Sequence, residues 1–245
     1  MKAGLLEKIK IIKGEGFVTI EDTNHLTNKE FNDFIPFFMN LPYVKTAKNV
    51  NILVDSKFNN EVDIMLEEYG FRLHDENLSV YKDLNESSEQ ISDFSLKDLE
   101  NISINEFKRV WEESMKGSLN SPSSLTMEEQ MRSVEVELGP RYKRSCMVAC
   151  ENNQPIGVVI PHIEPGTLKE GRLFYFGLIP EERGKGKSLP LHQHALNVLK
   201  NVFKAEYYIG STSRNNVPMV KTFEHNGCSV LTRNRVYKKN YEAFN

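Results

Sequence analysis

The sequence predicts a mixed α/β protein made of two domains. Its 245 residues are too many for one small core and suit two modest domains. Segments whose apolar residues recur at helical spacing alternate with short apolar runs typical of strands. The most polar stretch, residues 85–90, has no apolar residue to bury. We therefore interpret it as the linker between a domain over residues 1–88 and a larger one over residues 92–245.

The composition excludes several classes of partner. The formal net charge of −3 leaves no basic excess for nucleic acid, and no apolar window is long enough to span a membrane. Charges interrupt the N-terminus before a signal-peptide core forms. Cys146 and Cys150 lack the spacing and partner ligands of a zinc knuckle, so we expect buried thiols and no metal. Only three cysteines suit a reduced compartment, and we expect a cytoplasmic monomer or homodimer.

The second domain shows its elements in a clear order. Capping boxes at residues 103–106 and 126–129 predict two helices, which end at Gly117 and before Gly139. Residues 173–179 are apolar almost without a break, so we expect a strand covered on both faces. The remaining predicted elements are strands at 146–150, 156–160 and 207–210, a helix from about Ser188 to Phe203, a helix ending at Gly227, and a strand through Val236 and Tyr237.

The first domain repeats the end of the second in a weaker form. We predict a helix over residues 27–38, which Pro36 should kink or shorten, a strand at 50–54 and a helix over 59–69. Three features then recur in the same order at near-equal spacing. Asn59-Asn60, Gly70 and Val80-Tyr81-Lys82 correspond to Asn215-Asn216, Gly227 and Val236-Tyr237-Lys238. We interpret the first domain as a degenerate duplicate.

A glycine-rich segment between a predicted strand and a predicted helix carries the most chemical information. Its two glycines let the backbone approach a ligand and direct N–H groups at it, while the helix N-terminus adds about half a positive charge. Arg183, Lys185 and Lys187 add full charges, and Ser188 adds a hydroxyl group. Such a construction binds a diphosphate. The segment is Leu178-Ile179-Pro180-Glu181-Glu182-Arg183-Gly184-Lys185-Gly186-Lys187-Ser188.

A nucleotide-hydrolase P-loop is one interpretation of this segment, because Gly186-Lys187-Ser188 is similar to the end of that motif. The motif requires a glycine five residues before Gly186, where this sequence has Glu181, a negative side chain at the place of the phosphates. The apolar run that ends in Asp55 resembles a magnesium-binding strand, but it precedes the loop and falls in the other predicted domain. We therefore disfavour the P-loop interpretation.

The second domain resembles the GNAT superfamily of N-acetyltransferases from about Ser92 to Tyr241. The glycine-rich segment resembles the first GNAT signature, with Arg183 followed by Gly184 and Gly186, although Ser188 occupies the position of a glycine or alanine. The second signature is similar to Asn216, Met219, Phe223, Glu224 and Gly227, and Gly157 after the predicted hairpin also fits. The resemblance implies a mixed, mostly antiparallel sheet flanked by helices, preceded by a smaller domain that resembles a partial GNAT repeat.

The resemblance also implies a cofactor and a site. The cofactor would be acetyl-CoA, with its pantetheine arm along Leu178, Ile179 and Pro180 and its pyrophosphate on Arg183, Gly184, Lys185, Gly186, Lys187 and Ser188. Asn216 would contact the arm near the thiol. The acceptor would be a small-molecule or peptide amine, bound between the first two helices of the second domain, the loop 117–125 and the first domain. In the first domain, residues 21–26 contain two acids and no glycine loop, so we expect no coenzyme A there.

Catalytic residues are not evident. GNAT enzymes often use a tyrosine seven residues after the asparagine to protonate the leaving thiolate, and here that position is Phe223. The strand residues 173–177 contain no carboxylate to act as a base. We interpret Glu170, just upstream, as a solvated turn residue, and Tyr175 as a core residue. An alternative function is therefore a non-catalytic acyl-CoA-binding sensor or scaffold.

Overall fold

The computed structural model describes residues 3–14, 16–85, 94–120 and 125–240. The chain divides into two compact units, one of Met1–Leu78 with Thr232–Asn245 and one of Ser79–Leu231. This division differs from the predicted domains, 1–88 and 92–245, at the C-terminal end. The difference arises because strand β10 (Ser229–Asn240) pairs with β3 (Asn49–Asp55) of the first unit. Except for Asn85, the predicted linker 85–90 lies outside the described residues.

The first unit contains four neighbouring strands in the order β1-β2-β3-β10. β1 (Lys10–Gly14) and β2 (Phe17–Glu21) form an antiparallel pair, β2 runs parallel to β3, and β3 runs antiparallel to β10. The helical segments of this unit are α1 (Ala3–Leu6), the 3-10 turn η1 (Thr23–His25), α2 (Asn28–Phe38), α3 (Pro42–Lys45) and α4 (Asn60–Glu68).

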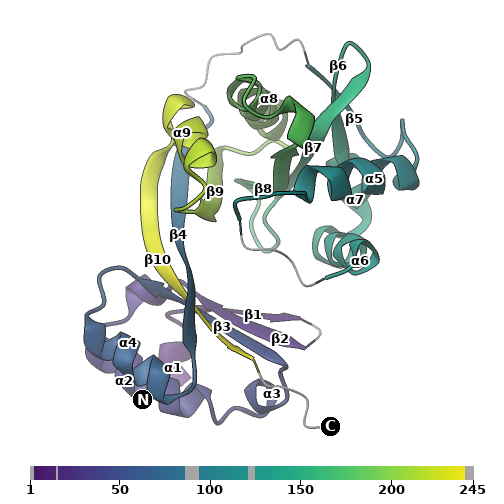
Figure 1. Ribbon diagram of the computed structural model, residues 1–245. Coiled ribbons are helices and arrows are strands. Elements are labelled where there is room, and N and C mark those ends of the chain that lie inside the picture. Colours follow the sequence, from purple (N-terminus) through teal and green to yellow (C-terminus); the bar gives the residue numbers. More distant parts are fainter. Residues whose placement is uncertain (1–2, 15, 86–93, 121–124, 241–245) are drawn as a thin grey trace. The chain divides into compact units, whose positions relative to one another are not determined.

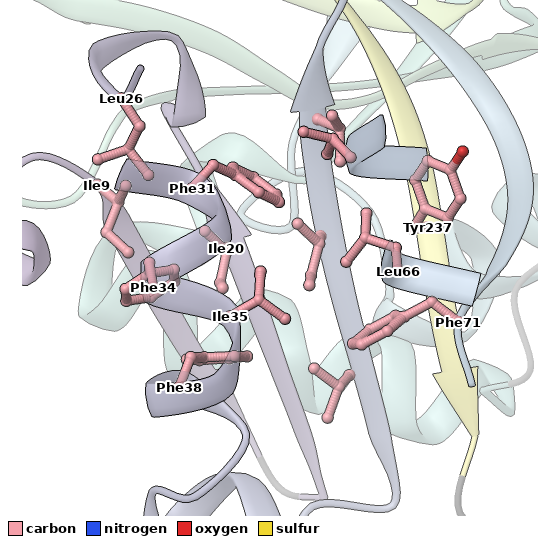
Figure 2. Close-up of a cluster of buried hydrophobic side chains, with 14 of the residues drawn as sticks. Ile9, Ile20, Leu26, Phe31, Phe34, Ile35, Phe38, Leu66, Phe71 and Tyr237 are labelled. Atoms are coloured by element: carbon pink, nitrogen blue, oxygen red, sulfur yellow. The ribbon is translucent and has the colours of Figure 1, made fainter. Parts of the chain in front are cut away.

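The core of the first unit lies between α2 and its strands (Figure 2). Phe31, Phe34, Ile35 and Phe38 are buried on one face of α2, at the helical spacing seen in the sequence. A capping box begins α2: the Thr27 side chain accepts a hydrogen bond from the Glu30 N–H, and the Glu30 carboxylate accepts from the Thr27 N–H. Pro36 lies inside the last turn of α2, which ends two residues later.

Each half of the sequence contributes its last strand to the unit of the other half. The end of β4 (Arg72–Asp83) belongs to the second unit, where it neighbours β9 (Tyr207–Ser213) and the rings of Tyr81 and Tyr207 stack at 5.8 Å. Residues 234–240 of β10 take the equivalent place beside β3 in the first unit. Residues 80–82 and 236–238, which correspond in sequence, therefore occupy corresponding positions, in agreement with the predicted duplication.

The second unit has a mostly antiparallel sheet in the order β4-β9-β8-β7-β6-β5 (Figure 1). Strands β5 (Phe94–Lys97), β6 (Met147–Glu151), β7 (Gln154–Ile163) and β8 (Glu170–Leu178) pair antiparallel in succession, and β8 runs parallel to β9. The helical segments are α5 (Ile104–Met115), α6 (Met127–Leu138), η2 (Gly139–Arg141), α7 (Tyr142–Ser145), η3 (Pro180–Glu182), α8 (Ser188–Asn201) and α9 (Val217–His225).

Helices cover both faces of this sheet. Phe107 and Trp111 of α5 belong to one buried cluster with Val158 and Ile160 of β7. Leu191 and Ala195 of α8 belong to another, with Ile156 and Val159 of β7. Helix-covered faces around a mixed, mostly antiparallel sheet are the predicted fold class, which is confirmed. No helix among the described residues is both long and apolar enough to cross a membrane.

Candidate active site

A cavity opens where β8 and β9 diverge. The two strands pair only at Glu170 with Tyr207 and at Gly171 with Tyr208. Just beyond, the register between β7 and β8 shifts between Ile160 and Pro161, so β8 carries a bulge there. Pro161 has no N–H for the ladder, and a bulge bends the strand that carries it. Bending at this place directs the rest of β8 away from β9.

The cavity has a volume of about 570 Å³ and belongs wholly to the second unit. Strand β8 is covered on both faces, as expected, since Phe174 and Tyr175 pack against the cluster that includes α5, and Leu173 and Phe176 against the cluster that includes α8. Residues 172–177 are nevertheless only partly buried. Side chains of β8 also form a wall of the cavity. The other lining residues come from the C-terminal end of α5, residues 117–120, the glycine loop, β9 and α9.

Seven of the ten predicted cofactor-binding residues line this cavity. They are Leu178, Arg183, Gly184, Gly186, Lys187, Ser188 and Asn216. Ile179, Pro180 and Lys185 do not line it. The Ile179 N–H donates to the Ile156 carbonyl at 3.0 Å, and the Pro180 carbonyl accepts from the Arg183 N–H at 3.2 Å, so these two residues anchor the end of β8 to the fold.

The glycine loop presents a row of backbone donors. Gly184 and Gly186 have φ angles of 72° and 76°, in the left-handed region that favours glycine. Among the hydrogen bonds of the described residues, none engages the N–H groups of the five residues 184–188. These donors precede α8, whose N-terminus carries partial positive charge. The loop is therefore built to bind an anion such as a diphosphate.

Arg183 has a structural role that the sequence did not reveal. Its Nε donates to the Leu178 carbonyl at 3.0 Å, Nη1 to the Gly117 carbonyl at 3.2 Å and Nη2 to the Ser114 carbonyl at 2.8 Å. The guanidinium group thus joins the end of β8 to the C-terminal end of α5, where it complements the negative end of the helix dipole. This side chain therefore binds backbone carbonyls of the protein, and the residue also lines the cavity.

The two loop lysines are paired with carboxylates. Lys185 Nζ lies 3.1 Å from Glu182, and Lys187 Nζ lies 2.6 Å from Glu151 and also contacts Glu182. Hydrogen bonds with Glu151 and Glu182 raise the pKa of Lys187, and those from Lys187 and Lys185 lower the pKa of Glu182. The charge of each lysine is shared with neighbouring acids, so the uncompensated donors of the loop are its N–H groups.

Asn216 is the N-cap of α9. Its side-chain oxygen accepts from the Met219 N–H at 3.3 Å, while its Nδ2 donates to Asn120 Oδ1 at 3.2 Å. Asn120 Oδ1 also accepts from Thr212 Oγ1 at 3.0 Å and from the Ser213 N–H at 3.4 Å. Asn120 therefore holds residues 117–120 across the end of β9. Asn120 was not among the predicted site residues.

Tyr175 and Glu170, the two residues considered above for proton transfer, both form hydrogen bonds within the protein. The Tyr175 hydroxyl donates to the Ser114 carbonyl at 2.8 Å, and burial raises the pKa of Tyr175 to about 12. Glu170 is the first residue of β8 and not a solvated turn residue: its carboxylate accepts from Arg172 at 2.6 Å and from the Tyr207 hydroxyl at 3.3 Å. Among the described residues, no cluster of His, Cys, Asp and Glu could hold a metal ion.

Phe223 is buried in α9 and lines the cavity at the place where the GNAT resemblance would have a tyrosine. A hydroxyl group is nevertheless close by. Tyr208 of β9 also lines the cavity, with its ring centroid 6.4 Å from that of Phe223.

Solved structures with a similar arrangement cover nearly the whole chain. A GCN5-related N-acetyltransferase from Sphaerobacter thermophilus matches with a TM-score of 0.64 at 13% identity, over 95% of this chain and 76% of that one. A tandem GNAT protein from the clavulanic acid biosynthesis pathway has a TM-score of 0.60 at 11% identity, over 95% and 78%. The chain has a GNAT-like fold. A functionally unknown conserved protein from Staphylococcus epidermidis has a TM-score of 0.59 at 12% identity, over 98% and 97%.

No family model and no curated protein matches this sequence. At identities of 11–13% the structural similarity concerns the fold. Activity must therefore be argued from the cavity and its residues.

Proposed function

We propose that the chain is an N-acetyltransferase, which transfers the acetyl group of acetyl-CoA to an amine by direct attack in a ternary complex. The row of unengaged N–H groups at residues 184–188, beside the cavity between β8 and β9, carries the proposal. A diphosphate satisfies several such donors at once, and the α8 dipole favours its charge. The gap between diverging strands suits an extended arm with amide groups, such as pantetheine, because strand edges offer it backbone partners.

Different residues bind different parts of acetyl-CoA in this proposal. Gly184, Gly186 and Ser188 bind the diphosphate, Leu178 contacts the pantetheine arm, and Asn216 contacts the arm near the thiol. Arg183 acts indirectly in this proposal, because its guanidinium group fixes the end of β8 against the carbonyls of Ser114 and Gly117. The rigid end of β8 then holds the arm in place.

The acceptor amine reaches the thioester from the side of residues 117–120. Ser118, Leu119 and Asn120 line the cavity on that side, and Asn120 holds the segment to β9 and Asn216. No carboxylate on β8 is placed to act as a base, so the amine loses its proton to solvent in the proposed reaction. The acceleration then comes mainly from holding the amine against the thioester, which supplies large effective concentrations.

Release of free thiol from acetyl-CoA, measured against a panel of amines, tests the proposal. The panel should contain peptide N-termini, lysine side chains, polyamines and amino sugars. We expect acetyl-CoA to bind the folded chain, raise its melting temperature and release thiol with at least one class of amine. An absence of acetyl-CoA binding would refute the proposal.

A second candidate function is a non-catalytic acyl-CoA sensor or scaffold. Phe223 at the tyrosine position and the absence of a carboxylate from residues 173–177 of β8 favour it. The same experiment separates the two, because a sensor binds acetyl-CoA but releases no thiol with any amine of the panel.

A further inference from the structure

Two tyrosines occupy matching places on the two strands that form the cavity. Each lies along its own strand over a glycine two residues later: a Cβ added at Gly177 would lie 2.7 Å from the Tyr175 hydroxyl, and one at Gly210 would lie 2.4 Å from the Tyr208 hydroxyl. Both tyrosines line the cavity. The glycines therefore make room for two hydroxyl groups that point along the diverging strands.

The two hydroxyl groups differ in where their hydrogens go. The Tyr175 hydroxyl is committed, since it donates to the Ser114 carbonyl at 2.8 Å. The Tyr208 oxygen lies 3.4 Å from His192 Nε2, and the role of each atom depends on the tautomer of the imidazole. That tautomer determines whether the Tyr208 hydrogen is available to a ligand.

Asn226 fixes the tautomer of His192. Its Nδ2 donates to the Leu189 carbonyl at 3.2 Å, and a carbonyl only accepts, so this amide atom must be the nitrogen. The same Nδ2 lies 2.9 Å from His192 Nδ1, which must therefore accept. Burial lowers the pKa of His192 to about 3, so the ring is neutral and carries its single hydrogen on Nε2.

With the hydrogen on Nε2, His192 donates to the Tyr208 oxygen. The Tyr208 hydroxyl then keeps its own hydrogen for another acceptor, and no described group takes it. Burial also raises the pKa of Tyr208, which favours the protonated hydroxyl. Tyr208 is thus a donor at the wall of the cavity.

The position of Tyr208 places this donor at the reacting end of the cavity. Tyr208 and Gly171 form the last β9–β8 pair before the strands diverge, so Tyr208 lies at the closed end of the gap. The glycine loop lies at the other end of β8. An arm that runs from a diphosphate at the loop into the gap therefore carries its thioester toward Tyr208.

We propose that Tyr208 donates the hydrogen bond that stabilises the departing thiolate, and that His192 and Asn226 position its hydroxyl group. The inference rests on the proposed acetyl transfer. The amine nitrogen forms a bond to the carbonyl carbon, the carbon–sulfur bond breaks, and its electron pair stays on sulfur. The nitrogen loses one proton to solvent, the thiolate gains one from solvent on release, and Tyr208 remains protonated throughout.

A measurement on bound coenzyme A tests the hydrogen bond without any amine. Coenzyme A labelled with carbon-13 at the carbon bonded to sulfur reports ionisation of its thiol by NMR. A hydrogen bond to the thiolate lowers the thiol pKa, by about one to two units relative to the Tyr208→Phe variant. Tyr207→Phe is the matched control, because it removes a hydroxyl from the same strand that faces Glu170 and not the cavity.

Steady-state kinetics test the same role in turnover. Tyr208→Phe should lower kcat by about 10- to 100-fold and change the KM for acetyl-CoA by less than about threefold. His192→Leu should give a similar loss. His192→Gln, whose amide nitrogen can still donate to the Tyr208 oxygen, should recover most of the rate. Melting temperatures near that of the parent establish that the variants fold.

Two results would overturn the assignment of Tyr208. One is a bound thiol that titrates alike in the parent and in Tyr208→Phe, and the other is a kcat that falls no further in Tyr208→Phe than in Tyr207→Phe. If the parent binds no coenzyme A at all, the proposed function fails, and the role of Tyr208 fails with it. Because the NMR titration needs binding and no acceptor, it distinguishes these cases.

Discussion

Replacement of Gly186 by valine should abolish acetyl-CoA binding and leave the fold intact. Gly186 has a φ of 76°, and an added Cβ would meet no atom within 4 Å. The cost of the side chain is therefore conformational, about 1–3 kcal/mol, and the loop relieves it by rotating neighbouring N–H groups away from the ligand. Loss of two charge-assisted hydrogen bonds to the diphosphate, at about 1.5–3 kcal/mol each, weakens binding by about two to four orders of magnitude.

Titration calorimetry with acetyl-CoA measures this loss, and Gly166→Val is the matched control. Gly166 has a φ of 86°, an added Cβ there also meets nothing within 4 Å, and the residue does not line the cavity. Both variants should lose similar stability, but only Gly186→Val should lose affinity. Acetyl-pantetheine, which lacks the diphosphate, should bind both variants alike. Unchanged acetyl-CoA affinity in Gly186→Val would mean that the diphosphate binds elsewhere.

The remaining predictions concern stoichiometry, Phe223 and pH. Calorimetry should give one coenzyme A per chain, because the N-terminus of α2 already carries the carboxylate of Glu30 in its capping box; two sites would contradict this. Phe223→Tyr should change kcat by no more than about tenfold, since a new hydroxyl must also be correctly placed; a larger gain would mean that the parent lacks an effective donor. Burial lowers the pKa of His192 in the folded state, so the unfolded chain binds more protons below pH 6.5. The free energy of unfolding therefore decreases as the pH is lowered below 6.5. As the pH is lowered from 6.5 to about 4, the melting temperature of the parent should therefore fall more steeply than that of His192→Gln. Equal changes of melting temperature with pH in the two proteins would contradict the neutral state assigned to the buried His192 ring.

Elements with a strong local signal could be predicted from the sequence. The helix expected from Ser188 begins at that residue, because apolar spacing and a glycine loop define its start locally. The box at residues 126–129 caps α6 as expected. By contrast, β5 covers only residues 94–97 and is stabilised by its pairing with β6, which no local pattern encodes. The partner of β10 was likewise missed, because its pairing with β3 joins residues far apart in the sequence.

The candidate site was predictable where it depends on backbone conformation. Glycines at positive φ before a helix follow from sequence, and they form the loop of N–H donors. Side-chain partners did not follow: the carbonyls that engage Arg183 come from residues 114 and 117, on a different element. The sequence did contain one pattern that indicates Tyr208 as a donor. The triplets Tyr175-Phe176-Gly177 and Tyr208-Ile209-Gly210 share a spacing that places each tyrosine over a glycine in a strand.

The identity of residue 223 affects the hydrogen bonding of Tyr208, because both residues pack against His192. The Phe223 ring packs edge-on against His192, with centroids 5.4 Å apart, and offers the imidazole no acceptor. The hydrogen on His192 Nε2 is therefore left with the Tyr208 oxygen as its partner. A tyrosine at position 223 would bring a second hydroxyl group to this cluster and a competing acceptor for that hydrogen. The apolar ring thus keeps the Tyr208–His192–Asn226 chain in a single hydrogen-bonding direction, which ends at Tyr208, a residue of the cavity wall.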